Sequence, residues 1–239
     1  MDFDRDHLFS QMAIELTDFV STEETVETIS QYARLAVDGD DAGVLLLHAR
    51  NRVETTAGTS NDVNRAHQVE SDLEEGPCLE TVAGGDQTHL VEDVLTDGRW
   101  PRWGQALADL GYRSVISCSL DTRSRRFGSL NVYAHRTGAF SDSDAGVIKI
   151  LAAHASVAIA SAKLRADMYA ALGTRTTIGQ AEGILMHAFD ISAEQSFAYM
   201  RRLSQDQNVK LIRVAEQVVE ARGVLGRGRD ARQTAAELS

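Results

Sequence analysis

The sequence is poor in cysteine, and its histidines show no pattern typical of a metal site. Only two of the 239 residues are cysteine, Cys78 and Cys118. Two cysteines are too few for a disulfide framework and suit a reducing compartment. None of the seven histidines has the spacing of metal ligands. We therefore expect neither a disulfide-stabilised secreted domain nor a metal site.

Signals for export and for a membrane are also missing. The first twelve residues, MDFDRDHLFSQM, are acidic and lack the basic and apolar segments of a signal peptide. The longest apolar stretch, VIKILAAHASVAIASA, contains Lys149 and His154 and is too short to span a bilayer. With 43% hydrophobic and 25% charged residues, the composition is that of a globular protein. We expect it to be cytoplasmic and to have no membrane partner.

Basic charge is scarce in the first two thirds of the chain. The formal net charge is −11, but 11 basic and 9 acidic residues lie from Lys163 onward, against 13 basic and 26 acidic before it. An acidic body repels nucleic acid, whereas a mildly basic end can bind phosphate. Solvation alone also explains such an imbalance, so both interpretations stay open.

Hydrophobic periodicity predicts an α+β domain over the first 140 residues. Helical patterns cover 5–20, 22–36, 61–73 and 103–111. Strand patterns cover 42–49, 52–58, 88–94, 113–121 and 127–135, and 74–82 has the composition of a loop. Because helices and strands are mixed and do not strictly alternate, we expect an antiparallel sheet with flanking helices.

The pattern is helical from Ser141 onward. A long helix begins at Ser141 or Ser143, and apolar residues follow close to a 3-4 repeat. They are Val147, Leu151, Ala155, Ala158, Ala162, Tyr169 and Leu172. This seam could pack on the domain's own sheet or join two chains in a parallel coiled coil. Both arrangements are open for 141–160, and we favour the coiled coil for 161–172.

Three shorter helices are expected after Gly173. The second begins at Ser192, whose spacing to Gln195 predicts a capping box, and the third begins at Asn208. The expected buried residues are Ile178, Ala181, Leu185 and Phe189 in the first helix, Phe197, Met200 and Leu203 in the second, and Leu211, Val214, Ala215 and Val218 in the third.

Residues 171–220 resemble an ANTAR domain, a three-helix module that binds RNA and prevents transcription termination. The resemblance rests, in order, on TR at 174–175, IGQAEGILM, SAEQSF, LSQ and NVKLIRVAEQVV. It implies a target of paired RNA hairpins with short apical loops in nascent transcripts. One hairpin per protomer implies a homodimer.

Residues 20–160 resemble a GAF domain, a small-molecule-binding or sensory α+β fold. The motifs EGPCLETVAGG, VEDVLTDGRWPRWGQALADLGYRSVISCSL, FGSLNVYA and GAFSDSD occur in the family's order. We therefore expect a GAF-like sensory domain (1–160), a helical coiled-coil linker (161–173), an ANTAR-like domain (174–222) and a flexible tail (223–239). Bacterial GAF-ANTAR proteins resemble sensors with an RNA-binding output, which implies a non-catalytic antitermination regulator.

RNA binding requires cations for phosphate and polar groups for unstacked bases. Within the ANTAR-like frame the candidates are Arg175, Gln180, Gly183, Arg201, Arg202, Ser204, Gln205, Asn208, Lys210 and Arg213. Each arginine, taken alone, also fits a solvated surface. Glu182 departs from the family, which often has a lysine there. A carboxylate repels phosphate, so it puts RNA affinity or target choice in question unless it pairs with a cation such as Arg175.

Gly179 and Gly183 stand inside a helix, where each glycine costs ~1 kcal/mol relative to alanine. Four residues apart, they share one helical face that lacks side chains. Either a neighbouring helix packs closely against this face, or RNA approaches it. Both explanations are open.

The GAF resemblance implies a pocket between the sheet and the loops near 60–113. Its candidate lining residues are Cys78, His89, Trp100, Trp103 and Tyr112. We expect no cofactor, and the sequence does not identify a small-molecule ligand. The tryptophans also fit packing anchors, and His89 fits a structural hydrogen-bonding role. Cys78 precedes a helical stretch whose N-terminus could stabilise a thiolate.

Two other functions are compatible with the sequence. A GAF-type reductase would use Cys78 and Cys118 for thiol chemistry, although we favour two small buried apolar residues as the explanation of these cysteines. Alternatively, the helical end could bind another protein instead of RNA. The salt dependence of binding distinguishes RNA from a protein partner. Affinity for RNA phosphates falls as ionic strength rises, whereas affinity at an apolar helix interface does not.

Overall fold

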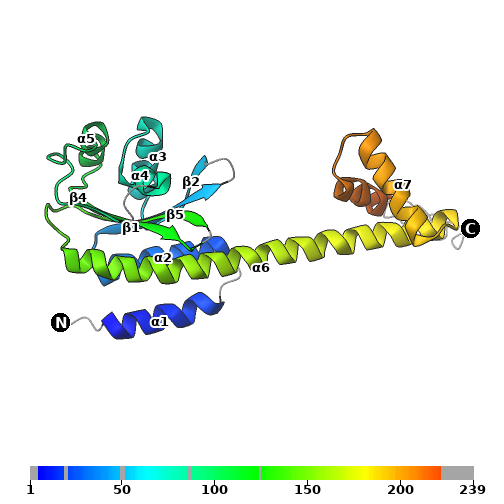
Figure 1. The fold of residues 1–239 in the computed structure, drawn as a ribbon, viewed down its shortest axis with the longest axis horizontal. Helices are drawn as coiled ribbons and strands as arrows, with labels where there is room; N and C mark the ends of the chain where they lie inside the picture. The colour runs from blue at the N-terminus through cyan, green and yellow to red at the C-terminus, as the bar shows by residue number, and fades with distance from the viewer. Residues whose placement is uncertain (1–4, 19–20, 49–51, 85–87, 124, 222–239) are drawn as a thin grey trace, which may run out of the picture. The chain divides into compact units, whose positions relative to one another are not determined.

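The computed structural model describes residues 5–18, 21–48, 52–84, 88–123 and 125–221 (Figure 1). The chain divides into two compact units, Met1–Ala166 and Asp167–Ser239. We describe each unit by itself. The predicted flexible tail, 223–239, lies outside the described residues.

The first unit is built on a five-stranded sheet in the order β2-β1-β5-β4-β3. The strands are β1 (Asp41–His48), β2 (Arg52–Gly58), β3 (Thr88–Val91), β4 (Ser114–Asp121) and β5 (Arg126–Ala134). Every neighbouring pair is antiparallel. The α+β fold and the antiparallel sheet are therefore confirmed, although β3 is shorter than the predicted strand.

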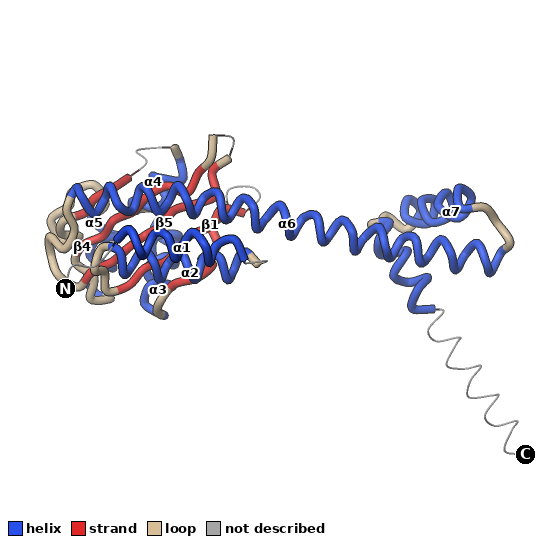
Figure 2. Tube along the Cα trace, turned by 90° about the horizontal axis from the view of Figure 1, so that it is seen from below, coloured by secondary structure: helices blue, strands red, loops and turns tan. Residues whose placement is uncertain are grey.

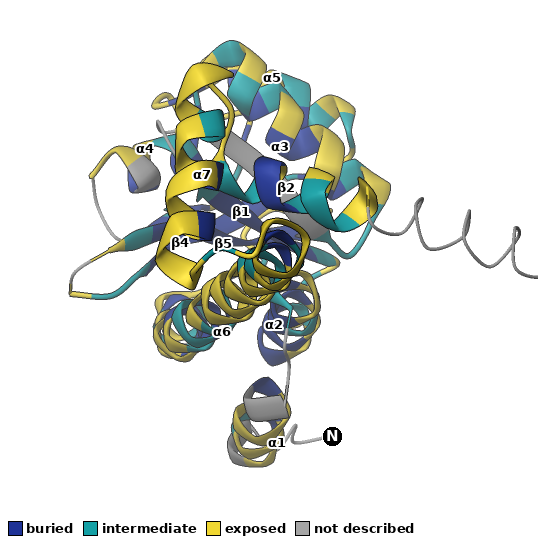
Figure 3. Cartoon of the chain, turned by 90° about the vertical axis from the view of Figure 1, so that its right-hand side faces the viewer, coloured by how far each residue is buried: buried dark blue, intermediate teal, exposed yellow. Residues whose placement is uncertain are grey.

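Helices cover both faces of this sheet (Figure 1). One face packs against α2 (Thr22–Ala36) and the first part of α6 (Asp142–Phe189), and α1 (Arg5–Asp18) adds its apolar side to this core. Figure 2 shows these three helices on one side of the strands. The other face carries α3 (Asn61–Leu73), α4 (Pro77–Ala83) and α5 (Pro101–Asp109). The central strands are buried between the two layers (Figure 3).

Helix α4 occupies most of the stretch predicted as a loop, 74–82, so that prediction is wrong there. Pro77 occupies the first turn, where its missing N–H is not needed and its fixed φ suits a helix. Gly76 at the N-cap offers no capping side chain. A seven-residue helix of this kind has little stability of its own, and its cap comes from another helix, as described below.

Helix α6 is one continuous helix of 48 residues and does not end at Gly173, which corrects the expected break. The hydroxyl groups of Thr176 and Thr177 donate to the carbonyl oxygens of Leu172 and Gly173, at 2.9 and 3.1 Å. At its start Ser141 Oγ accepts from the Asp144 amide, at 3.3 Å, which confirms one of the two predicted caps.

The full length of α6 also corrects the argument that its apolar stretch is too short for a bilayer. By length and composition alone the helix could cross a membrane, and it is the one helix among the described residues that could. Half of its most apolar 18-residue window is buried inside the protein. Core helices of globular proteins pass the same test, so the finding is weak evidence for a span.

The predicted seam of α6 packs on the sheet of its own unit as far as Ala158. Leu151, Ala155 and Ala162 are buried, and the first two belong to the core under the sheet. Tyr169 and Leu172, the last two members of the predicted seam, are instead 62% and 59% exposed. Leu172 and four other apolar side chains of α6 form a group that we call the exposed stripe. Its members, between 52% and 62% exposed, are Ile150, Val157, Leu164, Met168 and Leu172.

The second unit is a three-helix arrangement. The end of α6, α7 (Ala193–Asp206) and a helix over 211–221 enclose a small core. Its buried members are Ala181, Leu185, Met200, Val214 and Ala215. The capping box of Ser192 and Gln195 is confirmed, because each side chain bonds the other residue's backbone N–H.

Three details of this unit correct the sequence analysis. Phe189 and Phe197, expected to be buried, are 62% and 38% exposed. The core is small and is filled by alanine, leucine, methionine and valine, so neither ring is needed within it. The third helix begins at residue 211 and not at Asn208. Asn208 has φ 52°, which is a left-handed conformation suited to a turn between helices.

Candidate functional site

Polar side chains lie buried between α3, α4 and the middle of the sheet. Each is at most 1% exposed. We call this group the polar cluster, and it consists of His67 and Glu70 on α3, Cys78 and Thr81 on α4, and Ser117, Ser129 and Asn131 on β4 and β5. The interior of a small domain is usually apolar, so a buried group of this kind indicates a specific role.

Glu70 joins the two helices of the polar cluster. Its Oε1 accepts from the backbone amides of Cys78 and Leu79, at 2.7 and 3.1 Å. These amides belong to the first turn of α4, so a side chain from α3 caps α4. Gly76 adopts φ 150°, and a Cβ there would collide with the Glu70 side chain. Burial raises the pKa of Glu70 to about 7, although its hydrogen bonds favour the ionised form.

Asn131 links the sheet to both helices. The Cys78 thiol donates to Asn131 Oδ1 at 3.0 Å, and Asn131 Nδ2 donates to His67 Nε2 at 3.2 Å. His67 therefore carries its proton on Nδ1. Burial lowers the pKa of His67 to about 4, so the ring is neutral at pH 7.

The polar cluster has spare hydrogen-bonding capacity. Within the described part of the chain, His67 Nδ1, Glu70 Oε2 and Thr81 Oγ1 are buried and have no hydrogen-bond partner. Leaving such a group unpaired costs about 1–3 kcal/mol. Among the same described residues, the Ser117 hydroxyl of the polar cluster is buried without a partner as well. A small polar molecule could satisfy such groups.

The predicted pocket residues all lie in this same layer. Cys78 belongs to the polar cluster, and Trp100, Trp103 and Tyr112 form an apolar group beside it. His89 meets Trp100 edge-on, with ring centroids 5.3 Å apart. The structure therefore places these residues on one side of the sheet. That they bind a ligand stays a prediction.

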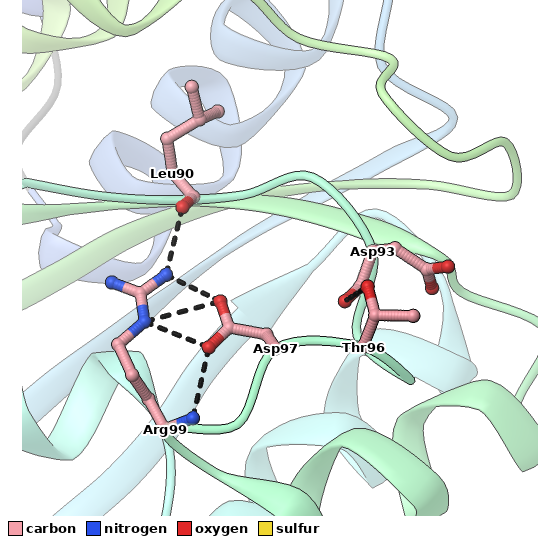
Figure 4. Close-up of polar contacts among 5 residues, drawn as sticks. All are labelled: Leu90, Asp93, Thr96, Asp97 and Arg99. Atoms are coloured by element: carbon pink, nitrogen blue, oxygen red, sulfur yellow. Dashed lines mark hydrogen bonds and ion pairs between the residues drawn. The ribbon is translucent and has the colours of Figure 1, made fainter.

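Arg99, in the loop before α5, packs against the ring of Trp100. The Arg99 guanidinium lies 4.5 Å from the Trp100 ring centroid. Arg99 also donates to Asp97 and to the carbonyl oxygen of Leu90, at 3.0 Å for the latter (Figure 4). These contacts fix the edge of the apolar group and give Trp100 a packing role.

The two cysteines lie on opposite faces of the sheet, so they do not form a redox pair. Cys78 contacts Asn131 beneath α4, whereas Cys118 belongs to the core shared with α2 and α6. Burial raises the pKa of both thiols, and Glu70 raises that of Cys78 further. The predicted stabilisation of a Cys78 thiolate by a helix N-terminus is wrong, because desolvation outweighs it.

Glu70, His67 and Asn131 were not among the site residues predicted from the sequence. A signal for the first two was present, since Val63, Ala66, His67 and Glu70 share the buried face of α3. Two polar residues on an apolar helical face indicate buried polar chemistry. Asn131 gave no such signal, because β5 is buried on both faces and shows no polar and apolar alternation that would single it out.

The predicted RNA-binding residues lie at the surface of the second unit. Arg175, Gln180, Gly183, Arg201, Arg202, Gln205, Asn208, Lys210 and Arg213 are exposed, and Ser204 is half-buried. Arg202 faces Asp206 at 3.7 Å and Arg213 faces Glu216 at 2.8 Å. Such exposed pairs are weak and can exchange for phosphate. The Ser204 hydroxyl donates to the carbonyl oxygen of Val209 at 2.6 Å and closes the turn after α7.

The glycines of α6 face open space. A Cβ added at Gly179 or Gly183 would meet nothing within 4 Å. Close packing against a helix of the same chain is therefore not what requires them. A groove of about 570 Å³ lies beside Gly179. It is lined by Ala171, Thr174, Arg175, Ile178, Gly179 and Glu182 on α6 and by Phe197 on α7.

Two family models match the chain. The GAF domain model matches residues 20–160, and the ANTAR domain model matches residues 166–219. This chain belongs to the GAF-ANTAR family. At the family level, the pairing joins a sensor domain to an RNA-binding antitermination output, and both domains are regulatory and not catalytic.

Solved structures share the fold of about two thirds of this GAF-ANTAR protein. The GAF domain of the cyanobacteriochrome TePixJ is 16% identical, with a TM-score of 0.52 over 62% of this chain and 95% of that one. The GAF domain of an Acinetobacter phosphoenolpyruvate-protein phosphotransferase is 17% identical, with a TM-score of 0.52 over 69% and 97%. Free methionine-R-sulfoxide reductase from Neisseria meningitidis is 15% identical, with a TM-score of 0.50 over 67% and 90%. These identities show the fold alone. A comparison with curated proteins gives no match.

Proposed function

We propose that this protein is a signal-responsive, cytoplasmic regulator that binds paired RNA hairpins in nascent transcripts and prevents their termination. The observation that carries the proposal is the ANTAR match over 166–219, on a unit that exposes five candidate cations. We assign the sensory role to 1–160, the linker to 161–173 and the RNA-binding role to 174–222.

The input site is the polar cluster together with the apolar group beside it. Spare donors and acceptors at His67, Glu70 and Thr81 support a polar small-molecule signal. The ligand must bind two states of the domain with different affinity, because equal affinity would shift no equilibrium. Cys78 contributes a hydrogen bond to this site and no thiol chemistry.

The protein acts as a homodimer joined through the exposed stripe of α6. Its members are spaced by seven, seven, four and four residues, so they lie on one face of the helix and could pack against the same face of a second copy. Two protomers would then hold one hairpin each, and the second hairpin would bind at high effective concentration.

Binding to tandem-hairpin RNA tests this function. The purified protein should bind more weakly as ionic strength rises, because phosphate contacts release counterions. The double variant Arg201→Ala/Arg202→Ala should bind less tightly, and an RNA with a single hairpin should lose the gain from pairing. Binding that ignores salt and tolerates the double variant would instead favour a protein partner for the helical unit.

A further inference from the structure

The groove beside Gly179 carries an unusual combination of side chains. Phe197 presents an aromatic ring that is 38% exposed, and Gly179 lines the groove without a side chain. Arg175 brings a cation and Glu182 a carboxylate. Among the described residues no ion pair joins Arg175 to Glu182 or engages either one. Both charges are therefore available to an occupant.

The groove is structurally defined. The Ser196 hydroxyl donates to the carbonyl oxygen of Glu182 at 3.2 Å, and Ser196 is fully buried. This bond fixes the first turn of α7, and with it Phe197, against the turn of α6 that carries Glu182. A volume of about 570 Å³ lies within the range of about 300–1,000 Å³ typical of sites for small ligands.

The charges and shape select the occupant. A phosphate would meet repulsion from Glu182, and an apolar side chain would leave both charges without a partner. An unstacked nucleobase has a flat face for an aromatic ring and a polar edge for hydrogen bonds. Its own phosphate can lie outside the groove, where Arg175 can reach it.

The carboxylate distinguishes among the four bases. Guanine alone has two adjacent donors on its Watson–Crick edge, N1–H and the N2 amino group, which match the two oxygens of a carboxylate. Adenine and cytosine offer one amino group next to an acceptor nitrogen. Uracil offers one N–H between two carbonyl oxygens, which a carboxylate repels.

We propose that the groove is a base-specific pocket in which Glu182 recognises one unstacked guanine of an RNA loop. The guanine stacks on Phe197 and passes close to the bare backbone at Gly179, and its edge donates twice to Glu182. The carboxylate that is unfavourable for phosphate thus becomes the residue that selects the target. This inference rests on the proposed RNA binding of the same unit.

Inosine substitution tests the pocket. Tandem-hairpin RNAs are prepared with each loop guanine replaced in turn by inosine, which lacks the N2 amino group, or by adenine. The full-length protein should lose about tenfold in affinity at one loop position, which is the scale of a bidentate base contact. Glu182→Ala should bind the unmodified RNA about as weakly as the wild type binds that substituted RNA, and should not discriminate between the two.

Two further variants keep the test decisive. Glu194→Gln removes an exposed carboxylate outside the groove and should keep the discrimination. Gly179→Leu should fill the groove and weaken binding of the guanine loop, while the helical content of the protein is unchanged by circular dichroism.

The outcomes separate the two proposals. If the RNA binds in a salt-dependent manner but wild type and Glu182→Ala respond equally to every loop substitution, the pocket is wrong and the RNA-binding function stands. If no hairpin RNA binds at low salt, the function itself is wrong, and the pocket with it.

Discussion

The two units of this protein place their polar chemistry in opposite environments. In the GAF unit, His67, Glu70 and Asn131 are buried and bonded to one another or to backbone across three elements. In the ANTAR unit, the candidate cations are exposed, and the two that form ion pairs do so with a residue three or four positions away on the same helix. A buried polar group strongly affects stability and an exposed one hardly does. Mutations in the two units should therefore differ in what they change.

The largest expected effect is on the pH dependence of the GAF unit. The pKa of Glu70 is about 7, above its ordinary 4.5. The folded state therefore binds more protons between these values, and stability falls as pH rises through that window. The pKa of His67 is about 4, below its ordinary 6.5, so stability rises with pH between 4 and 6.5. The two trends oppose each other in the wild type.

Single variants should separate these trends. In His67→Gln only Glu70 titrates, so the free energy of unfolding should fall as pH rises from 4.5 to 7. In Glu70→Gln only His67 titrates, so the free energy of unfolding should rise between pH 4 and 6.5. Each change should amount to at most about 3 kcal/mol. Urea unfolding between pH 4 and 8 measures both. Parallel slopes in the two variants would show that one of the groups titrates normally in the folded protein.

A smaller effect is expected when the cap of α4 is removed. Glu70→Ala leaves the amides of Cys78 and Leu79 without their acceptor, which should lower the free energy of unfolding by about 1–3 kcal/mol at pH 7. Glu70→Gln keeps an amide oxygen in the same place and is the matched control. An equal loss in both variants would mean that the charge of Glu70, and not its role as acceptor, stabilises α4.

Two glycines of α6, Gly179 and Gly146, allow an effect on stability to be separated from an effect on RNA binding. Gly179→Ala should stabilise α6 by ~1 kcal/mol, because the added Cβ meets nothing in the chain, and should weaken RNA binding. Gly146→Ala also adds a Cβ in open space on α6, but in the GAF unit, so it should stabilise without changing RNA binding. Thermal unfolding and RNA titration check the pair. Unchanged binding by Gly179→Ala would remove the bare face from the RNA interface.

The smallest effect on stability is expected at the surface of α7. Arg202→Ala breaks its exposed pair with Asp206 and should change the free energy of unfolding by less than about 0.5 kcal/mol. If Arg202 contacts a phosphate, the slope of log affinity against log salt should fall by about one. Asp206→Ala breaks the same pair and should leave that slope unchanged or slightly steeper.

Local signals in the sequence predicted structure well, and contacts between distant segments were not predictable. The capping box at Ser192 and the helix over 61–73 depend on residues within a few positions of each other. Helix α4 was mistaken for a loop because it has no capping residue of its own in the sequence. The acceptor that caps it is the carboxylate of Glu70 on α3. The continuity of α6 was missed because one glycine costs too little to end a long helix.

The candidate sites show the same limit. The exposed cations of the ANTAR unit followed from the family resemblance, and their role in RNA binding stays a prediction. His67 and Asn131 stand 64 positions apart, and no periodicity connects a residue on α3 to one on β5. Cys118 stands on β4 and Cys78 on α4. Which face of the sheet each thiol occupies depends on the folded sheet and on where α4 packs, so their opposite positions did not follow from the sequence.

The cap that Glu70 provides makes two backbone amides into internal reporters. The N–H groups of Cys78 and Leu79 should exchange with deuterated solvent only when α3 and α4 separate, since their acceptor belongs to the other helix. Their exchange rates would therefore report how often α3 and α4 separate above the polar cluster. A molecule that enters beneath α4 would change those two rates before any effect on RNA could be detected.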